Sequence, residues 1–250
     1  MRPLSDAAKT VLRLSPRIEV LPILHGSGDV AQEVRETLIG RPFDCVAVPL
    51  PPSFESAVES AVSYLPHLSL VAVPDSDSDE PTVTFVPVDP CQPVIMGIRV
   101  AMGESIARAY IDREVERFEP TSFSAPDPYA IKHIPLAAFS AALIPSLTPP
   151  IEESQRAARI AWMAFRLHEL ELEFESILCC VLLPIGPGYV TPIISEHRTS
   201  FPSRLRVVHQ SILPIRIRFI SCWESYRLPR RCTSTDERSC ARIATSQSTE

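Results

Sequence analysis

The sequence predicts an α/β domain built on a mainly parallel sheet with flanking helices, followed by a poorly ordered C-terminal tail. Short apolar runs alternate with helix-like patterns along the chain, an arrangement typical of a parallel sheet. Runs such as residues 43–50 are apolar almost throughout, as expected of strands buried on both faces. After Pro184 this periodicity fades and Ser and Thr become dense. We therefore expect a leader (1–16), one α/β domain (17–184) and an irregular tail (185–250).

The first half of the predicted domain begins with a β-rich run, residues 17–24. Pro22 within it favours an edge strand or a bulge, since proline cannot donate to a ladder. Residues 28–39 predict a helix, because their apolar side chains recur at helical spacing, and Gly40 is expected to end it. Further strands are expected at 43–50, 68–73 and 82–88, the last two able to pair as a hairpin, and helices at 56–65, with Ser53 as N-cap, and 90–103.

The second half continues the alternation. Residues 105–112 predict a strand that ends in an acid, and a proline-studded loop follows to Tyr129. Two helices are expected at 136–147 and 152–174, the second with Glu152 and Glu153 in its first turn, where acids stabilise a helix. Residues 176–183 predict the last clear strand, and one or two more are allowed within 207–220.

Charge and composition exclude several classes of protein. Residues 1–184 carry 14 Lys and Arg against 25 Asp and Glu, a net charge of −11, which argues against nucleic-acid binding. No apolar run approaches the length of a membrane span, and the first residues lack the apolar core of a signal peptide. The seven cysteines include no C-x-x-C pair. We expect a reduced, cytoplasmic protein that binds neither nucleic acid nor membrane, and the oligomeric state stays open.

The best candidate site is the turn His25-Gly26-Ser27-Gly28-Asp29, between the first predicted strand and its helix. In an open parallel sheet, ligands bind beyond the carboxyl ends of strands. Gly26 and Gly28 would let the backbone approach an anion, Ser27 or Asp29 could cap the helix, and His25 stands where a catalytic or metal-binding side chain belongs. The alternative is a helix cap beside a packed histidine, and the two readings are about equally favoured.

Three acids follow or precede predicted strands and form a second candidate set. Asp44, Asp89 and Asp112 could join His25 in a mixed metal site for a divalent ion or in an acid–base pair. Asp112 directly follows its strand and is the best of the three, whereas Asp89 precedes a proline and is more often a turn residue. The alternative reading for all three is caps, turns and surface acids.

The sequence contains none of the common catalytic motifs that would add residues to these candidates. No P-loop lysine follows the glycines, no G-x-S-x-G elbow is present for an esterase, and no H-E-x-x-H zinc motif occurs. The sequence therefore predicts where a small molecule or metal would bind and leaves its chemistry open.

The HGSG turn, the helix after it and the segment VAVPLPPS (Val46–Ser53) resemble the Tiki/TraB-type superfamily, which includes ChaN-like and erythromycin-esterase-like proteins. These proteins typically begin with a strand ending in His, then a helix, then a strand ending in an acid. AYID, ending at Asp112, resembles a later strand of that pattern. The resemblance covers Arg17 to about Asp112 and implies a metal-dependent hydrolase. Pro49 stands where the strand-end glutamate is expected, so that mechanism would have lost a ligand.

Two functional alternatives follow. The first is a hydrolase-like protein with a small-molecule or metal site at His25–Asp29, using Asp89 and Asp112. The second is a binding or scaffold domain that has lost the catalytic residues of the superfamily. For residues 185–250 we also consider a frameshift origin, because their net charge of +5 opposes that of the body. The resemblance also implies a Trp-rich segment at this point, and this chain has IGPGYV there instead. An uninterrupted frame on resequencing, with similar tails in relatives, would exclude that origin.

Overall fold

The computed structural model describes residues 12–74, 83–119, 126–143, 147, 149–182 and 213–215. All of them belong to one compact unit, Met1–Ile217. Its strands are β1 (Ile18–Ile23), β2 (Cys45–Val48), β3 (Ser69–Pro74), β4 (Val83–Val88), β5 (Ala107–Tyr110), β6 (Ile177–Leu182) and β7 (Leu213–Ile215). Its helices are α2 (Gly28–Gly40), α3 (Glu55–Val62), α4 (Pro93–Gly103), α5 (Leu136–Leu143) and α6 (Gln155–Glu173), with short 3-10 turns η1 (Pro52–Phe54) and η2 (Pro128–Lys132).

Four strands form the parallel sheet that the sequence predicts, in the order β1-β6-β2-β5. The last of them in the chain, β6, lies between β1 and β2, so that Cys179 pairs with both Val20 and Ala47. This central position explains why its sequence, ILCCVL, contains no polar residue. Strand β1 lies at one edge, which confirms the edge position expected from Pro22.

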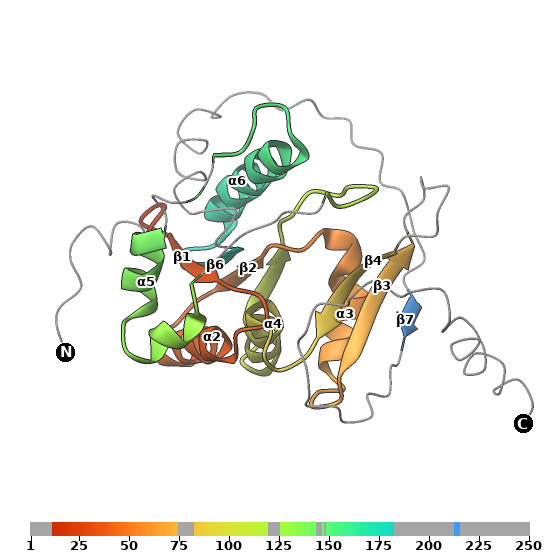
Figure 1. The fold of residues 1–250 in the computed structure, drawn as a ribbon, viewed down its shortest axis with the longest axis horizontal. Helices are drawn as coiled ribbons and strands as arrows, with labels where there is room; N and C mark the ends of the chain where they lie inside the picture. The colour runs from red at the N-terminus through yellow and green to blue at the C-terminus, as the bar shows by residue number, and fades with distance from the viewer. Residues whose placement is uncertain are drawn as a thin grey trace, which may run out of the picture. The chain divides into compact units, whose positions relative to one another are not determined.

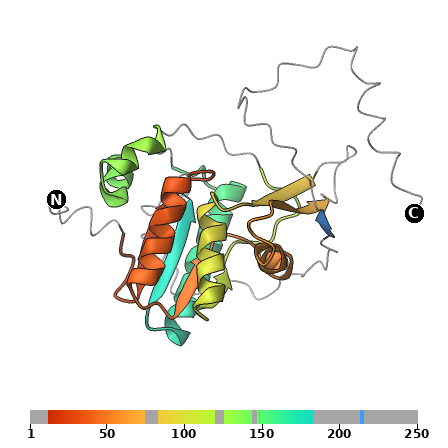
Figure 2. The ribbon, with the colours of Figure 1, turned by 90° about the horizontal axis from the view of Figure 1, so that it is seen from below.

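Helices cover both faces of this sheet (Figures 1 and 2). On one face, α2 and α4 lie side by side over an apolar core that contains Val34, Ile98 and Leu178. On the other face, α6 packs against Val20 and Cys179 through one apolar stripe. The stripe consists of Ile160, Met163, Ala164, Leu167 and Leu170. The predicted architecture, a mainly parallel sheet with flanking helices, is confirmed.

The predicted strands at 68–73 and 82–88 form a hairpin, as expected, in a second sheet of order β4-β3-β7. Residues 71–73 of β3 are buried, as expected of an apolar run, and within the described ranges β3 pairs only with β4 and β7, antiparallel to both. The short connection between β3 and β4 accounts for their antiparallel pairing, since a parallel pair needs a crossover of a dozen or more residues.

Several predicted boundaries are wrong by a few residues. Ser53 does not cap α3, because the turn η1 intervenes and the Ser53 hydroxyl bonds Glu114 instead. Glu152 and Glu153 precede α6, which is capped by the side chain of Ser154. Gly40 is the last residue of α2 rather than the residue after it.

Parts of the predicted organisation fall outside the described residues. These are residues 1–11 of the leader, residues 75–82, 120–125, 144–146, 148 and 183–184 of the predicted domain and, apart from β7, the whole of the tail 185–250. No helix within the described ranges is long and apolar enough to cross a membrane.

Candidate functional site

A cavity of about 370 Å³ opens at the carboxyl edge of the parallel sheet. The residues that follow β1, β2 and β5 line it, together with the last residue of β6. They are His25, Pro49, Leu50, Pro51, Asp112 and Leu182. The hairpin strand β4 contributes Thr84, Phe85, Val86 and Pro87, and Phe54, Gln92, Val94, Ile95, Phe118 and Arg159 complete the wall. Because parallel strands end at one edge, two of the three predicted catalytic residues, His25 and Asp112, reach the same cavity.

The HGSG turn joins β1 to α2 and is held by its own backbone and by Gln92, the residue that precedes α4. Gly26 has a φ of +72°, and its N–H donates to Oε1 of Gln92 at 3.1 Å. The Ser27 hydroxyl accepts from the N–H of Val30 at 3.3 Å, which confirms Ser27 as the helix cap. Asp29 forms a 3.7 Å ion pair with Lys132 of η2.

The predicted ligand-binding residues Gly26, Ser27, Gly28 and Asp29 do not line the cavity, although His25 beside them does. The Ser27 hydroxyl caps α2, and the Asp29 carboxylate forms an ion pair with Lys132. Their ligand-binding role stays a prediction.

Replacing Gly26 with alanine should destabilise the protein by about 1–2 kcal/mol, because a Cβ disfavours the left-handed region. No atom lies within 4 Å of the position that the new Cβ would take, so the cost comes from backbone conformation alone. The matched control is Gly40→Ala, which also meets open space but lies in a helix and should be neutral or stabilising. Urea unfolding followed by circular dichroism measures both, and equal effects would contradict the assigned turn.

His25 is solvent-exposed as a whole residue, yet neighbouring protein atoms remove water from its imidazole. This desolvation lowers the pKa of His25, and a side-chain hydrogen bond with Gln92 opposes the shift. The ring is therefore mainly neutral at neutral pH.

Gln92 is a site residue that the sequence analysis missed. Besides contacting His25 and Gly26, its Nε2 donates to Oδ2 of Asp89 at 3.2 Å. Asp89 itself does not line the cavity, and its Oδ1 accepts from the N–H of Cys91 at 2.7 Å. Asp89 thus supports the His25 side of the site through Gln92, and the structure shows the turn role that we weighed as its alternative.

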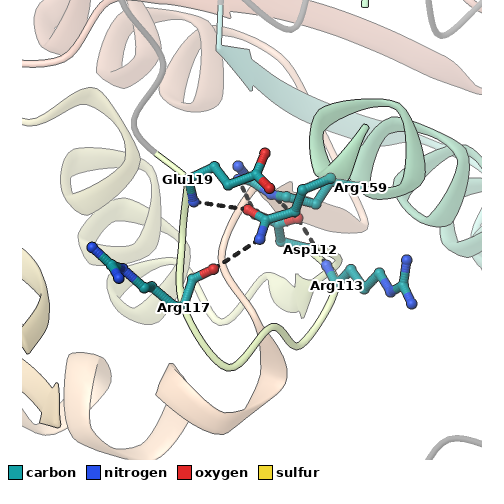
Figure 3. A network of polar contacts seen from close by, with 6 residues as sticks. Asp112, Arg113, Arg117, Glu119 and Arg159 are labelled. Carbon is teal, nitrogen blue, oxygen red and sulfur yellow. Dashed lines mark hydrogen bonds and ion pairs between the residues drawn. The ribbon is translucent and has the colours of Figure 1, made fainter. Parts of the chain in front are cut away.

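Asp112 is almost fully buried, with 1% of its side chain exposed, and it pairs with Arg159 of α6 (Figure 3). Nε of Arg159 lies 3.1 Å from Oδ1 and Nη2 lies 2.5 Å from Oδ2, a two-point contact. The N–H of Arg113 also donates to Oδ1 at 2.8 Å. The guanidinium carbon of Arg159 lies 4.8 Å from the centre of the Phe118 ring. The carboxylate is thereby neutralised by a cation that is itself held in place.

The first turn of α6 also fixes the loop that carries Phe118. The side-chain amide of Gln155 donates to the carbonyl of Arg117 at 2.8 Å and accepts from the N–H of Glu119 at 3.0 Å. Figure 3 shows these two loop residues beside the Asp112–Arg159 pair. One helix therefore places both the guanidinium and the aromatic ring at the cavity.

The two polar regions of the cavity lie at opposite ends. His25 follows β1 and Asp112 follows β5, the two outer strands of the four-stranded sheet. Three strand spacings of roughly 4.8 Å separate their axes by about 14 Å. Asp44, the remaining acid of the candidate set, precedes β2 at the other edge and accepts from the N–H of Ser176 at 3.0 Å. The catalytic roles of His25, Asp112 and Asp89 stay predictions.

Metal-binding chemistry has no further support in the described ranges, where no cluster of three or more His, Cys, Asp or Glu side chains could hold an ion. Pro49, at the position where the superfamily resemblance expects a glutamate, is buried and lines the cavity. Comparisons with protein-family models, with curated proteins and with solved structures found no match, so the resemblance to the Tiki/TraB-type superfamily stays a prediction.

Proposed function

We propose that the protein binds a small molecule with a largely apolar body in the cavity at the carboxyl edge of the parallel sheet. The observation that carries this proposal is the composition of the wall. Most of it is apolar, and apart from Thr84 its polar side chains form two pairs: His25 with Gln92, and Asp112 with Arg159. A cavity of about 370 Å³ with this lining matches the usual dimensions and chemistry of small-molecule sites.

The proposal predicts that a neutral apolar probe binds and that filling the cavity prevents it. Thr84 is half-buried and lines the cavity, so Thr84→Trp should lower the affinity for N-phenylnaphthylamine about tenfold or more by occupying its space. The control is Val83→Trp, one residue earlier on β4, where the side chain is 50% exposed and does not line the cavity. Fluorescence titration of the full chain measures both affinities. Equal loss in the two variants, or no saturable binding to the unmodified protein, would exclude this site.

Hydrolysis is the second candidate function, and the position of His25 in the cavity wall, where burial lowers the pKa of its imidazole, favours it. In this proposal, His25 accepts a proton from water as the water oxygen bonds to an ester or amide carbonyl carbon of the ligand. The imidazolium then returns that proton to the leaving alkoxide or amine as the C–O or C–N bond breaks, which yields a carboxylic acid and restores the neutral ring. The residue is not paired with Asp112, which is engaged by Arg159 at the other end of the cavity.

If hydrolysis is the function, His25→Ala should slow turnover of p-nitrophenyl butyrate by about a hundredfold or more, the usual contribution of a general base. His67→Ala is the control, since His67 is exposed and lies outside the cavity wall. Thermal melts of both variants separate catalysis from folding. The hydrolytic role is rejected if turnover equals that of free imidazole or is unchanged by His25→Ala. Neither result contradicts the binding proposal.

A further inference from the structure

The Asp112–Arg159 pair leaves one side of the Arg159 guanidinium unused. Asp112 takes the edge formed by Nε and Nη2. A guanidinium offers a second edge of parallel donors, formed by Nη1 and the other hydrogen of Nη2. Among the described residues, no acceptor contacts that edge, although 14% of the Arg159 side chain is exposed and the residue lines the cavity.

The guanidinium of Arg159 is held in a fixed orientation. Asp112 holds the guanidinium in its plane at two points, and the Phe118 ring covers one of its faces. The Asp112 carboxylate also receives the N–H of Arg113, and Gln155 holds the loop that carries Phe118. Because its side chain is already fixed, such an arginine loses little further conformational entropy when it binds a second planar acceptor.

A carboxylate is the acceptor that fits such an edge, because its two oxygens match two parallel N–H donors. A carboxylate adds one negative charge beside the Asp112–Arg159 pair, whereas a phosphate monoester adds almost two. The larger charge costs more to bury in a mostly apolar cavity whose one lining cation, among the described residues, already pairs with Asp112. The body of the ligand would then extend over Pro51, Phe54 and Leu182 towards His25, in keeping with the distance between the two polar ends.

We infer that the ligand of this cavity is a carboxylic acid with an elongated apolar body, whose carboxylate binds the open edge of Arg159. Asp112 acts as a positioning residue for that arginine. This inference rests on the proposed binding function, and it adds the chemical class of the ligand and its orientation.

The test compares octanoate with octanol, which share their carbon chain and differ in the head group. Each is titrated into the full-length protein loaded with N-phenylnaphthylamine, and displacement of the probe is measured. Octanoate should displace the probe at concentrations about ten- to a hundredfold lower than octanol, the range expected for hydrogen bonds to a charged group.

Variants then locate the head group. The double variant Asp112→Asn/Arg159→Gln removes both charges together, which avoids an unpaired buried carboxylate, and it should abolish the preference for octanoate. Arg166→Gln is the control on the same helix, where the arginine pairs with Glu169 at the surface, and it should keep the preference. Thermal melts establish that each variant is folded.

The outcomes distinguish the identity of the ligand from the existence of the binding site. If the probe binds but octanol displaces it as well as octanoate does, or neither displaces it, the ligand is not a carboxylic acid of this kind. The proposed binding site is then retained. If His25→Asn abolishes the preference and the double variant keeps it, the carboxylate lies at the opposite end and the inference is overturned. If the probe does not bind in the cavity at all, the proposed function fails first.

Discussion

Replacing Arg159 with methionine is expected to lower the free energy of unfolding by about 3–5 kcal/mol, the usual cost of leaving a buried charge without its partner. Asp112 has 1% of its side chain exposed, so water compensates its charge only in part once the guanidinium is lost. For a chain of this size, the melting temperature should fall by roughly 6 °C or more. Urea unfolding monitored by circular dichroism gives the free energy, and calorimetry gives the melting temperature.

Two controls show whether the loss of stability comes from the broken Asp112–Arg159 pair. Arg166→Met removes an arginine from the same helix whose ion pair with Glu169 is more than one third exposed, and it should cost no more than about 0.5 kcal/mol. Adding Asp112→Asn to Arg159→Met should recover part of the loss, because the stranded charge is then gone. A single variant as stable as Arg166→Met would contradict the burial assigned to Asp112.

Truncating Leu167 to alanine is the second large expected effect, a loss of about 2–5 kcal/mol. Leu167 is 1% exposed and lies in the apolar stripe through which α6 covers the sheet, in the same cluster as Val20 and Cys179. The surrounding strands cannot collapse into the space left behind, so lost transfer energy and a cavity both contribute. The same urea unfolding experiment measures it.

Leu172→Ala is the matched control for that truncation. Leu172 belongs to the same helix but is 78% exposed, so its replacement should change the free energy of unfolding by no more than about 0.5 kcal/mol. Similar losses at both positions would mean that α6 presents a different face to the sheet.

Most of the secondary structure could be predicted because its signals are local. The apolar run that contains Cys179 and Cys180 predicts a strand buried on both faces, and β6 is one. The helical spacing of Ile160, Met163 and Leu167 predicts the buried face of α6. The caps were less predictable, since Ser53 has the right side chain but its hydroxyl is engaged by Glu114, sixty-one residues away in the chain.

The candidate site was predicted only in part. His25 and Asp112 could be found because both follow predicted strands, and parallel strands bring their carboxyl ends together. Gln92, Phe118 and Arg159 carry no such signal. In the sequence, Arg159 is one of several dispersed arginines, on a helix whose clearest pattern is its apolar stripe. Its partner Asp112 lies forty-seven residues earlier, and only the packing of α6 brings the two side chains together.

By itself, the sequence determined the alternation of strands and helices, the buried faces and the edge at which a ligand would bind, because periodicity and turn chemistry act over a few residues. The tertiary structure alone decided that β6 enters between β1 and β2, that β3 leaves the parallel sheet, and that Asp112 is neutralised by Arg159. These features depend on contacts between residues far apart in the chain. Such contacts are stabilised by strand pairing and burial, which exist only in the assembled domain. The HGSG turn thereby supplies one end of a cavity, and the Asp112–Arg159 pair supplies the other.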